Sequence, residues 1–169
     1  MLPGQTAAES SECCCDAVRV SLLQDERRFV KDKAVCELCD QVGGTQIWKD
    51  ASCRVVLVED ADYPGFCRVI WNQHVKEMTD LSFAEREHFM ATVFAVEAAV
   101  REVMRPDKIN LASLGNMTPH LHWHIIPRFK QDKHFPQPIW GTAQRTGIST
   151  LPLDWQTRLT ESVFSKLSG

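Results

Sequence analysis

The stretch His120-Leu121-His122-Trp123-His124-Ile125-Ile126 alternates imidazole rings with apolar side chains and ends on two branched aliphatic residues. Alternation with a period of two predicts a β-strand, in which the three histidines share one face and the apolar residues share the other. Three adjacent imidazoles are an unfavourable way to fill a core, because each buried ring needs hydrogen-bond partners for both nitrogens. We therefore expect this strand to line a functional site.

The segments around this strand predict an α+β fold built on an antiparallel sheet. Ser82-Phe83-Ala84-Glu85 has the spacing of a helix capping box, and apolar residues recur behind it every three or four positions until Pro106. A C-terminal helix is outlined by apolar residues at helical spacing, namely Trp155, Leu159, Val163 and Leu167. Further strands are predicted over 53–58, 66–71 and 108–113, the first two as antiparallel neighbours. One long helix among such strands is typical of an α+β domain.

The chain of 169 residues is long enough for one compact domain, which we expect over 17–169, beginning with a short helix over 17–29. Residues 1–16 are small and polar, and we interpret them as a disordered leader. We find neither a secretory signal nor a membrane-spanning run, so we expect a cytoplasmic protein without a membrane partner. The net charge of -3 leaves no basic field of the kind that holds a nucleic-acid polymer.

Seven cysteines are an odd number for a complete disulfide framework, so reduced thiols or metal ligands are expected. Cys36 and Cys39 have the spacing at which two thiolates can bind one tetrahedral zinc ion, although such a site needs two more ligands. The alternative is a pair of reduced cysteines near a turn. We interpret the run Cys13-Cys14-Cys15 as incidental, and Cys53 and Cys67 as buried fillers of their strands.

The three histidines allow two kinds of chemistry. All three could bind one catalytic metal ion that activates water. Alternatively, one imidazole attacks phosphorus while its neighbours fix its tautomer and supply a proton to the leaving oxygen. The preceding loop favours the second hypothesis, because Gly115 and Asn116 would let backbone amides approach an anion closely. In addition, no acidic cluster lies near the histidines in the sequence to complete a metal site.

The histidine stretch, with Asn110, Gly115-Asn116 and the segment 65–74, resembles the histidine-triad (HIT) superfamily of nucleotide hydrolases and transferases, over roughly residues 35–130. The resemblance implies a five-stranded antiparallel sheet with a long helix, and a homodimer. It also implies that His122 is a nucleophile that forms a covalent nucleotidyl intermediate, with His120 and His124 as its orienting partners.

The resemblance also implies substrate-binding residues. Asn110 and the phosphate loop Gly115-Asn116 match family positions, and the acidic residue that binds the ribose hydroxyls is assigned to Asp60, with Glu59 as the neighbouring candidate. Asn116 is a shorter amide than the glutamine of the family, and three further positions depart from the family pattern: Phe66 replaces a histidine, Trp71 replaces a proline and Met117 replaces a hydroxyl residue. We therefore expect a divergent branch, and the departures leave its substrate open.

A structural zinc ion follows from the same resemblance. Some HIT proteins and the related galactose-1-phosphate uridylyltransferases bind zinc through two cysteines and two histidines, which correspond here to Cys36, Cys39, His74 and His120. Such a site would hold His120 as a ligand and leave His122 free for chemistry.

The residues after the histidine strand give weaker indications. Arg128, Lys130 and Lys133 could steer a polyphosphate or form an ordinary solvated face. A long irregular segment is expected over 128–147, and its His134 and Trp140 could cover the site or belong to a dimer contact.

Together these observations predict a nucleotide hydrolase or nucleotidyl transferase that acts at the α-phosphate of a purine nucleotide conjugate through His122. A dinucleoside polyphosphate is one such substrate, and no organic cofactor is expected. The alternatives are a metal-dependent hydrolase with the three histidines as ligands and a noncatalytic nucleotide-binding protein.

Overall fold

The computed structural model describes residues 36–147 and 151–168. The predicted leader, the helix expected over 17–29 and the cysteine run at 13–15 lie outside the described residues. Within the described ranges, no helix combines the length and the apolar composition that a membrane span requires.

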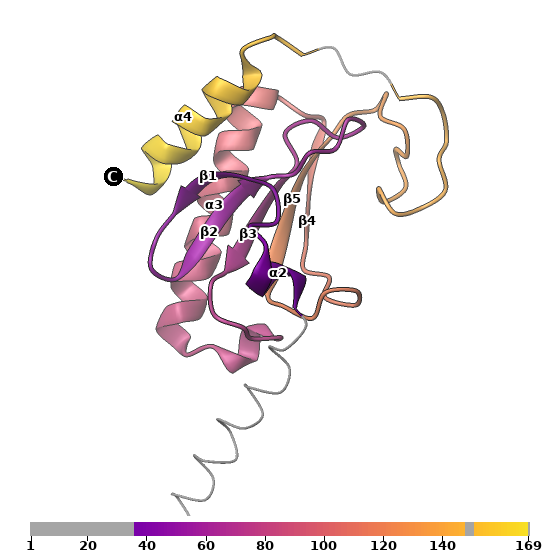
Figure 1. The fold of residues 1–169 in the computed structure, drawn as a ribbon. Coiled ribbons are helices and arrows are strands. Elements are labelled where there is room, and N and C mark those ends of the chain that lie inside the picture. The colour runs from indigo at the N-terminus through magenta and orange to yellow at the C-terminus, as the bar shows by residue number, and fades with distance from the viewer. Residues whose placement is uncertain (1–35, 148–150, 169) are drawn as a thin grey trace, which may run out of the picture. The chain divides into compact units, whose positions relative to one another are not determined.

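A five-stranded antiparallel sheet forms the centre of the described chain (Figure 1). Its strands are β1 (Thr45–Lys49), β2 (Cys53–Leu57), β3 (Cys67–Trp71), β4 (Lys108–Ala112) and β5 (His122–Arg128). They lie side by side in the order β1-β2-β3-β5-β4, and every neighbouring pair is antiparallel. The predicted α+β fold and the antiparallel pairing of β2 with β3 are confirmed, whereas β1 matches none of the runs that we predicted from the residues themselves.

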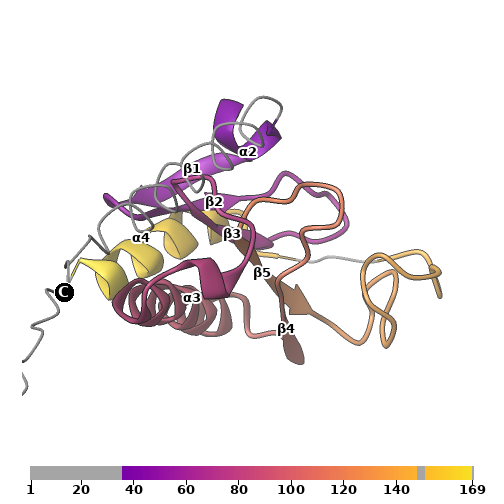
Figure 2. The ribbon, with the colours of Figure 1, turned by 90° about the horizontal axis from the view of Figure 1, so that it is seen from below.

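The long helix α3 (Phe83–Met104) and the C-terminal helix α4 (Trp155–Leu167) lie together on one face of the sheet (Figure 2). Ser82 caps α3 as predicted: its hydroxyl accepts a hydrogen bond from the Glu85 N–H, and the Glu85 carboxylate accepts one from the Ser82 N–H at 2.7 Å. Such a cap stabilises a helix by about 1 kcal/mol. The helix ends where Arg105 adopts a left-handed conformation with a φ of 48°, directly before Pro106.

Apolar residues on the two faces of the sheet form separate clusters. The larger cluster joins the sheet to α3 and includes Val69, Ile125 and Phe89. On the opposite face, Ile70 packs with Leu38 of the short helix α2 (Glu37–Asp40), so that α2 and α3 lie on opposite sides of the sheet (Figure 2). This second face, which the long helix leaves uncovered, carries the functional side chains described below.

Two further segments connect these elements. A single 3-10 turn, η2 (Met78–Asp80), precedes α3. Residues 129–147 form neither helix nor strand, as predicted. The Asp132 carboxylate fixes the beginning of this segment, because it pairs with Nε of Arg128 at 2.7 Å and accepts hydrogen bonds from the backbone N–H groups of His134 and Phe135. The chain then reaches Trp140, whose ring lies 5.3 Å from that of His124.

Candidate active site

The strand β5 places His122 and His124 on the face of the sheet opposite α3. In its pairing with β3, Ile70 lies opposite His122 and Arg68 lies opposite His124. Residues directly opposite one another in an antiparallel pair share a face, so these four side chains lie together. The predicted alternation is thus confirmed for His122 and His124. The strand is shorter than predicted, because β5 begins only at His122. The His120 ring, which precedes it, contacts Cys36 and Cys39 on this same side of the sheet.

Hydrogen bonds fix the His122 ring in one tautomer. Its Nδ1 lies 2.6 Å from the backbone oxygen of His120. Because a carbonyl oxygen only accepts, Nδ1 carries the proton of the neutral ring and Nε2 carries the lone pair. This Nε2 lies 3.1 Å from Nε2 of His124, which therefore donates the hydrogen bond between the rings. His122 presents a lone pair, and His124 presents an N–H group beside it.

Both rings are held in the neutral form near pH 7. Burial lowers the pKa of His122 and outweighs its hydrogen bond to His120, which raises the pKa, while the Arg68 charge lowers it further. Burial, the neighbouring His122 and the Arg68 charge lower the pKa of His124 to about 3. Neutral imidazole is the form that can attack an electrophile, so the environment favours a nucleophilic His122.

His122 and His124 line an open cavity of about 380 Å³, a size that suits a small-molecule ligand. The loop between β4 and β5 and the helix α2 form two of its sides, and Trp140 forms part of a third. The lining residues besides the two histidines are Glu37, Leu38, Arg68, Leu114, Asn116, Met117, Thr118 and Trp140. Trp140 is 54% exposed, so the cavity remains open to solvent beside this ring.

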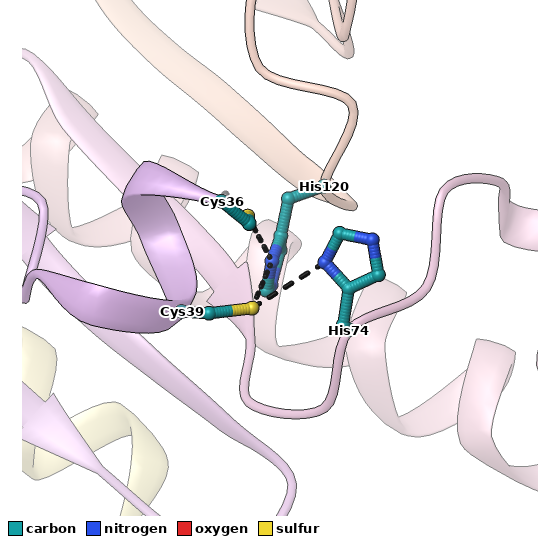
Figure 3. A group of neighbouring side chains, drawn as sticks. All are labelled: Cys36, Cys39, His74 and His120. Carbon is teal, nitrogen blue, oxygen red and sulfur yellow. Dashed lines mark hydrogen bonds between the residues drawn. The ribbon is translucent and has the colours of Figure 1, made fainter. Parts of the chain in front are cut away.

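A second site is formed by Cys36, Cys39, His74 and His120, whose side chains converge in Figure 3. The Nδ1 atom of His120 lies 3.4 Å from Sγ of Cys36 and 3.5 Å from Sγ of Cys39, and Nδ1 of His74 lies 3.3 Å from Sγ of Cys39. All four ligand atoms lie within 4.8 Å of one another. Zn–S bonds of about 2.3 Å and Zn–N bonds of about 2.0 Å in a tetrahedron imply S···N separations of roughly 3.5 Å. The group therefore fits a tetrahedral metal ion.

The orientation of the His120 ring agrees with a ligand role. Its Nε2 lies 2.6 Å from the backbone oxygen of Trp71, so Nε2 carries the proton and the Nδ1 lone pair faces the thiols. Both ring nitrogens are thereby engaged away from His122. The ring of His120 thus contacts the two cysteines, whereas His122 and His124 contact each other. This arrangement argues against a single catalytic metal ion bound by all three histidines.

The predicted substrate-binding residues lie in three places. Asn116 lines the cavity of His122. Asn110 lines a neighbouring cavity of about 720 Å³ beside β4, and its side-chain oxygen accepts a hydrogen bond from Arg128 at 2.6 Å. A Cβ added at Gly115 would meet nothing closer than 3.5 Å, so space alone does not require glycine there. Asp60 lies in the turn between β2 and β3, where it accepts a hydrogen bond from the Asp62 N–H, and it lines neither cavity.

The three departures from the family pattern have different surroundings. Phe66 is buried, and its ring packs beside that of His124 with the ring centres 5.5 Å apart. Trp71 is buried with its ring nearly perpendicular to that of Phe89, and its backbone oxygen accepts the hydrogen bond from Nε2 of His120 in the second site. Met117 is 95% exposed at the cavity rim.

The three cations that follow the histidine strand are paired with carboxylates. Arg128 pairs with Asp132 at 2.7 Å, Lys130 with Asp107 at 3.9 Å and Lys133 with Asp62 at 2.6 Å. None of the three lines the cavity of His122. Arg128 therefore has a structural role in the ion pair with Asp132. The structure gives no support to the prediction that these three cations steer a polyphosphate into the cavity of His122.

Arg68 is the cation that the described structure places in the cavity of His122, and we did not predict it from the sequence. The available signal was an arginine inside the otherwise apolar strand 66–71, between Cys67 and Val69. A charge in a central strand is unusual, because it must lie on a face that reaches solvent or a ligand.

Comparison with known proteins places the chain among histidine-triad proteins. An AP-4-A phosphorylase from Mycobacterium tuberculosis is 29% identical over 85 residues, which cover 47% of this chain and 44% of that relative. A bis(5'-adenosyl)-triphosphatase from Saccharomyces cerevisiae is 33% identical over 61 residues, which cover 33% of this chain and 30% of that relative. The matched region thus spans less than half the length of these two curated relatives.

Solved structures share the fold over most of the chain. A histidine triad protein from Bradyrhizobium japonicum matches with a TM-score of 0.61 and 27% identity, over 75% of this chain and 92% of that one. A zinc-bound histidine triad family protein from Mycobacterium smegmatis matches with a TM-score of 0.53 and 18% identity, over 80% of this chain and 95% of that one, which shows the fold alone. The family model of the HIT domain matches residues 41–131, more than half of the 169 residues. The chain therefore belongs to the HIT domain family.

Proposed function

We propose that this protein is a nucleotide hydrolase or nucleotidyl transferase that acts at the α-phosphate of a nucleotide conjugate, with Nε2 of His122 as the nucleophile. The observation that carries the proposal is the hydrogen bond of 2.6 Å from Nδ1 of His122 to the backbone oxygen of His120. It leaves the lone pair of a neutral ring on Nε2, and the ring lines a cavity large enough for a nucleotide group.

The reaction would proceed through two displacements. In the first, the Nε2 lone pair forms a bond to the α-phosphorus, and the bond from that phosphorus to the leaving oxygen breaks with its electron pair. The His122 ring keeps its Nδ1 proton and becomes cationic, and the backbone oxygen of His120 stabilises that charge. The N–H group of His124, released from His122 as phosphorus approaches, donates a hydrogen bond to a phosphoryl oxygen.

The second displacement resolves the intermediate. Water attacks the phosphorus, the N–P bond breaks, and its electron pair returns to Nε2 of His122. The water proton leaves with the product phosphate or passes to solvent, and a nucleoside monophosphate is released. Another acceptor in place of water would give nucleotidyl transfer by the same route.

The substrate class is supported by the kind of protein that the chain resembles. The matched relatives are named as an AP-4-A phosphorylase and a bis(5'-adenosyl)-triphosphatase. We infer that a purine nucleotide conjugate such as a dinucleoside polyphosphate is the substrate here. Asn116 lies at the cavity and is the predicted loop residue best placed to contact its phosphate.

A structural zinc ion is the second part of this proposal. Cys36, Cys39, His74 and His120 would hold it, and when bound it would act as a crosslink and supply no chemistry to the reacting phosphate. The crosslink would connect α2 to the loop after β3, which carries His74, and to the segment just before β5, which carries His120. His120 would then be fixed from both sides, and with it the carbonyl oxygen that selects the His122 tautomer.

Intact-mass analysis tests the catalytic assignment. The protein is incubated briefly with a diadenosine polyphosphate and quenched in denaturant at alkaline pH, where an N–P bond survives. We expect a mass increase of one adenylyl group that maps to His122 and is absent from His122→Ala. If no adduct forms with several adenylated substrates and AMP still binds, the noncatalytic nucleotide-binding alternative replaces this proposal.

A further inference from the structure

Arg68 lies on β3 directly across from His124 and lines the same cavity as the two histidines. It is half-buried, and its Nε atom is enclosed without a hydrogen-bond partner. Its guanidinium carbon lies 5.6 Å from the centre of the Phe66 ring, which supports one face of the group. In the described ranges 36–147 and 151–168, the side chain makes no hydrogen bond and no ion pair.

Other cations of the described chain are satisfied differently. Arg54 donates to the backbone oxygens of Leu38 and Val42, and Arg128 pairs with Asp132. Arg68 has only the more distant carboxylate of Glu37, which also lines the cavity and acts on it through its charge. Burial of an arginine without partners is unfavourable, and an anion bound in the cavity would offset that cost.

The position of Arg68 relative to His122 indicates which part of a substrate it would meet. Ile70, not Arg68, lies opposite His122, so Arg68 is displaced from the nucleophile by one side-chain position along the sheet. A diagonal of this kind spans about 7 Å between backbones, within the reach of an arginine side chain. The charge of Arg68 also lowers the pKa of both His122 and His124, in agreement with a place close to both rings.

We propose that Arg68 binds a phosphate of the leaving group, next to the α-phosphate that His122 attacks, and so selects nucleotide polyphosphates over conjugates whose leaving group carries no phosphate. The inference rests on the proposed function and adds its substrate class. A leaving phosphate departs as an anion when the P–O bond breaks, and no proton is needed. Arg68 stabilises the charge that develops on it, and the flat guanidinium can contact two phosphate oxygens at once.

Two substrates separate this role from simple α-phosphate binding. Diadenosine tetraphosphate carries phosphates in its leaving group, whereas the p-nitrophenyl ester of AMP carries none. For Arg68→Gln we expect kcat/KM to fall about 100-fold with the first and less than about threefold with the second. Arg68→Lys keeps the positive charge but loses the flat guanidinium that can contact two oxygens at once. Its kcat/KM with diadenosine tetraphosphate should therefore lie between those of wild type and Arg68→Gln. Arg101→Gln, an exposed arginine of α3, is the matched control and should change neither value.

Turnover of the p-nitrophenyl ester by Arg68→Gln also shows that the variant is folded. If kcat/KM fell equally with the two substrates, Arg68 would contact the α-phosphate, and the proposal would be overturned. It would also be overturned if kcat/KM fell with neither substrate.

A binding measurement keeps this test independent of the catalytic proposal. In His122→Ala, calorimetry should show ADP binding more tightly than AMP, and the added change Arg68→Gln should remove at least about tenfold of that preference. If the wild type turns over no substrate, the catalytic proposal fails while the ADP preference still tests Arg68. An ADP preference that survives Arg68→Gln overturns the present inference alone.

Discussion

The His122–His124 pair and the Cys36–Cys39–His74–His120 cluster share the short stretch His120–His124, which gives two histidines to the pair and one to the cluster, yet the two regions differ in tautomer and in access. His122 donates from Nδ1 to the His120 carbonyl and keeps its lone pair on Nε2, beside His124. His120 donates from Nε2 to the Trp71 carbonyl and leaves Nδ1 free. One lone pair therefore belongs to an open cavity, and the other faces two thiols.

The difference shows how one backbone carbonyl can assign a histidine to a task. β5 begins only at His122, and the ring of His120 just before the strand meets the thiols beside α2 and not the cavity of His122. Two adjacent sites of opposite tautomer can then be separated experimentally. Changes at the open cavity should affect rate and leave stability intact, whereas changes at the closed cluster should affect stability first.

The largest effect is expected from His122→Ala. The change removes the only atom that forms the covalent bond in the proposed reaction, so kcat should fall by about 10⁴-fold or more. The free energy of unfolding should fall by only about 1 kcal/mol, because the ring, although only 5% exposed, borders the cavity. Steady-state kinetics and urea unfolding measure the two quantities on the same preparation.

His88 on α3 provides the matched control for that variant. It is an exposed histidine whose Nε2 pairs with the Asp50 carboxylate at 2.7 Å, away from both sites. His88→Ala should keep full turnover. If His122→Ala kept an activity within tenfold of wild type, the Nε2 lone pair of His122 would not be the nucleophile. The contrast between a catalytic and a structural histidine would then be wrong.

The second largest effect is expected from Cys39→Ala in the zinc-loaded protein. Loss of one of four ligands should release the metal and lower the free energy of unfolding by on the order of 4 kcal/mol. Native mass spectrometry should find one zinc per chain in wild type and none in the variant. A chelator should lower the Tm of wild type and leave that of Cys39→Ala unchanged.

Cys67→Ala is the control for the loss of a thiol. Cys67 is buried in the core on the α3 side of the sheet, and burial raises the pKa of its thiol to about 12, so it stays protonated. The variant should keep its zinc and lose only about 1 kcal/mol through the small cavity. If a chelator left the Tm of wild type unchanged, the cluster would have no metal-dependent structural role.

The sequence predicted those features whose signal is local. The capping box of Ser82 and Glu85 and the alternation of His122 with Trp123 act within a few residues, and both are found as predicted. β1 was missed because Thr45–Lys49 is a short edge strand with a mixed burial pattern and a register irregularity between Gln46 and Trp48. Edge strands carry weak alternation, since only part of one face is covered.

Features that depend on contacts between distant residues were less accessible. The four members of the cysteine–histidine cluster meet although 84 residues separate Cys36 from His120, and only the family resemblance grouped them. Arg68 could be noticed as a charge in an apolar run, but its place beside His124 depends on the register of β3 with β5. The catalytic roles, the homodimer and the cytoplasmic location stay predictions.

A smaller effect is expected from Asp132→Asn. The change weakens the contacts that hold residues 129–147, the segment whose Trp140 lines the open cavity. Arg128 and Asp132 are 2% and 5% exposed, so the change leaves a buried guanidinium without its charge partner and should cost about 3 kcal/mol at pH 7. Nucleotide affinity should fall with it if these contacts position Trp140. Zinc binding should not change, because the closed cluster lies on other elements.

The loss in Asp132→Asn should depend on pH in one direction. Burial alone would raise the pKa of Asp132, but hydrogen bonds from Arg128 and from the His134 and Phe135 N–H groups outweigh it and lower the pKa below 3.8. The ion pair thus contributes its full stability above the ordinary pKa of the carboxyl and loses it as pH falls through the lower, folded value. The difference between wild type and variant should shrink below about pH 4 in unfolding titrations. A difference that grows in acid would contradict this account.

The smallest effect is expected from Trp140→Ala, which tests the cover of the open site directly. The ring meets His124 edge to face at 5.3 Å and is 54% exposed, so its removal leaves little buried surface unfilled and should hardly change stability. Trp140 also lines the cavity, and an aromatic ring packed against a bound nucleotide contributes about 1 kcal/mol, so the Kd for AMP should rise roughly fivefold while zinc content stays at one per chain. Phe164→Ala, an exposed aromatic of α4, is the control and should leave the Kd unchanged. If Trp140→Ala lowered zinc content as well, the two regions would share support through this ring, and the separation between an open catalytic site and a closed structural one would have to be abandoned.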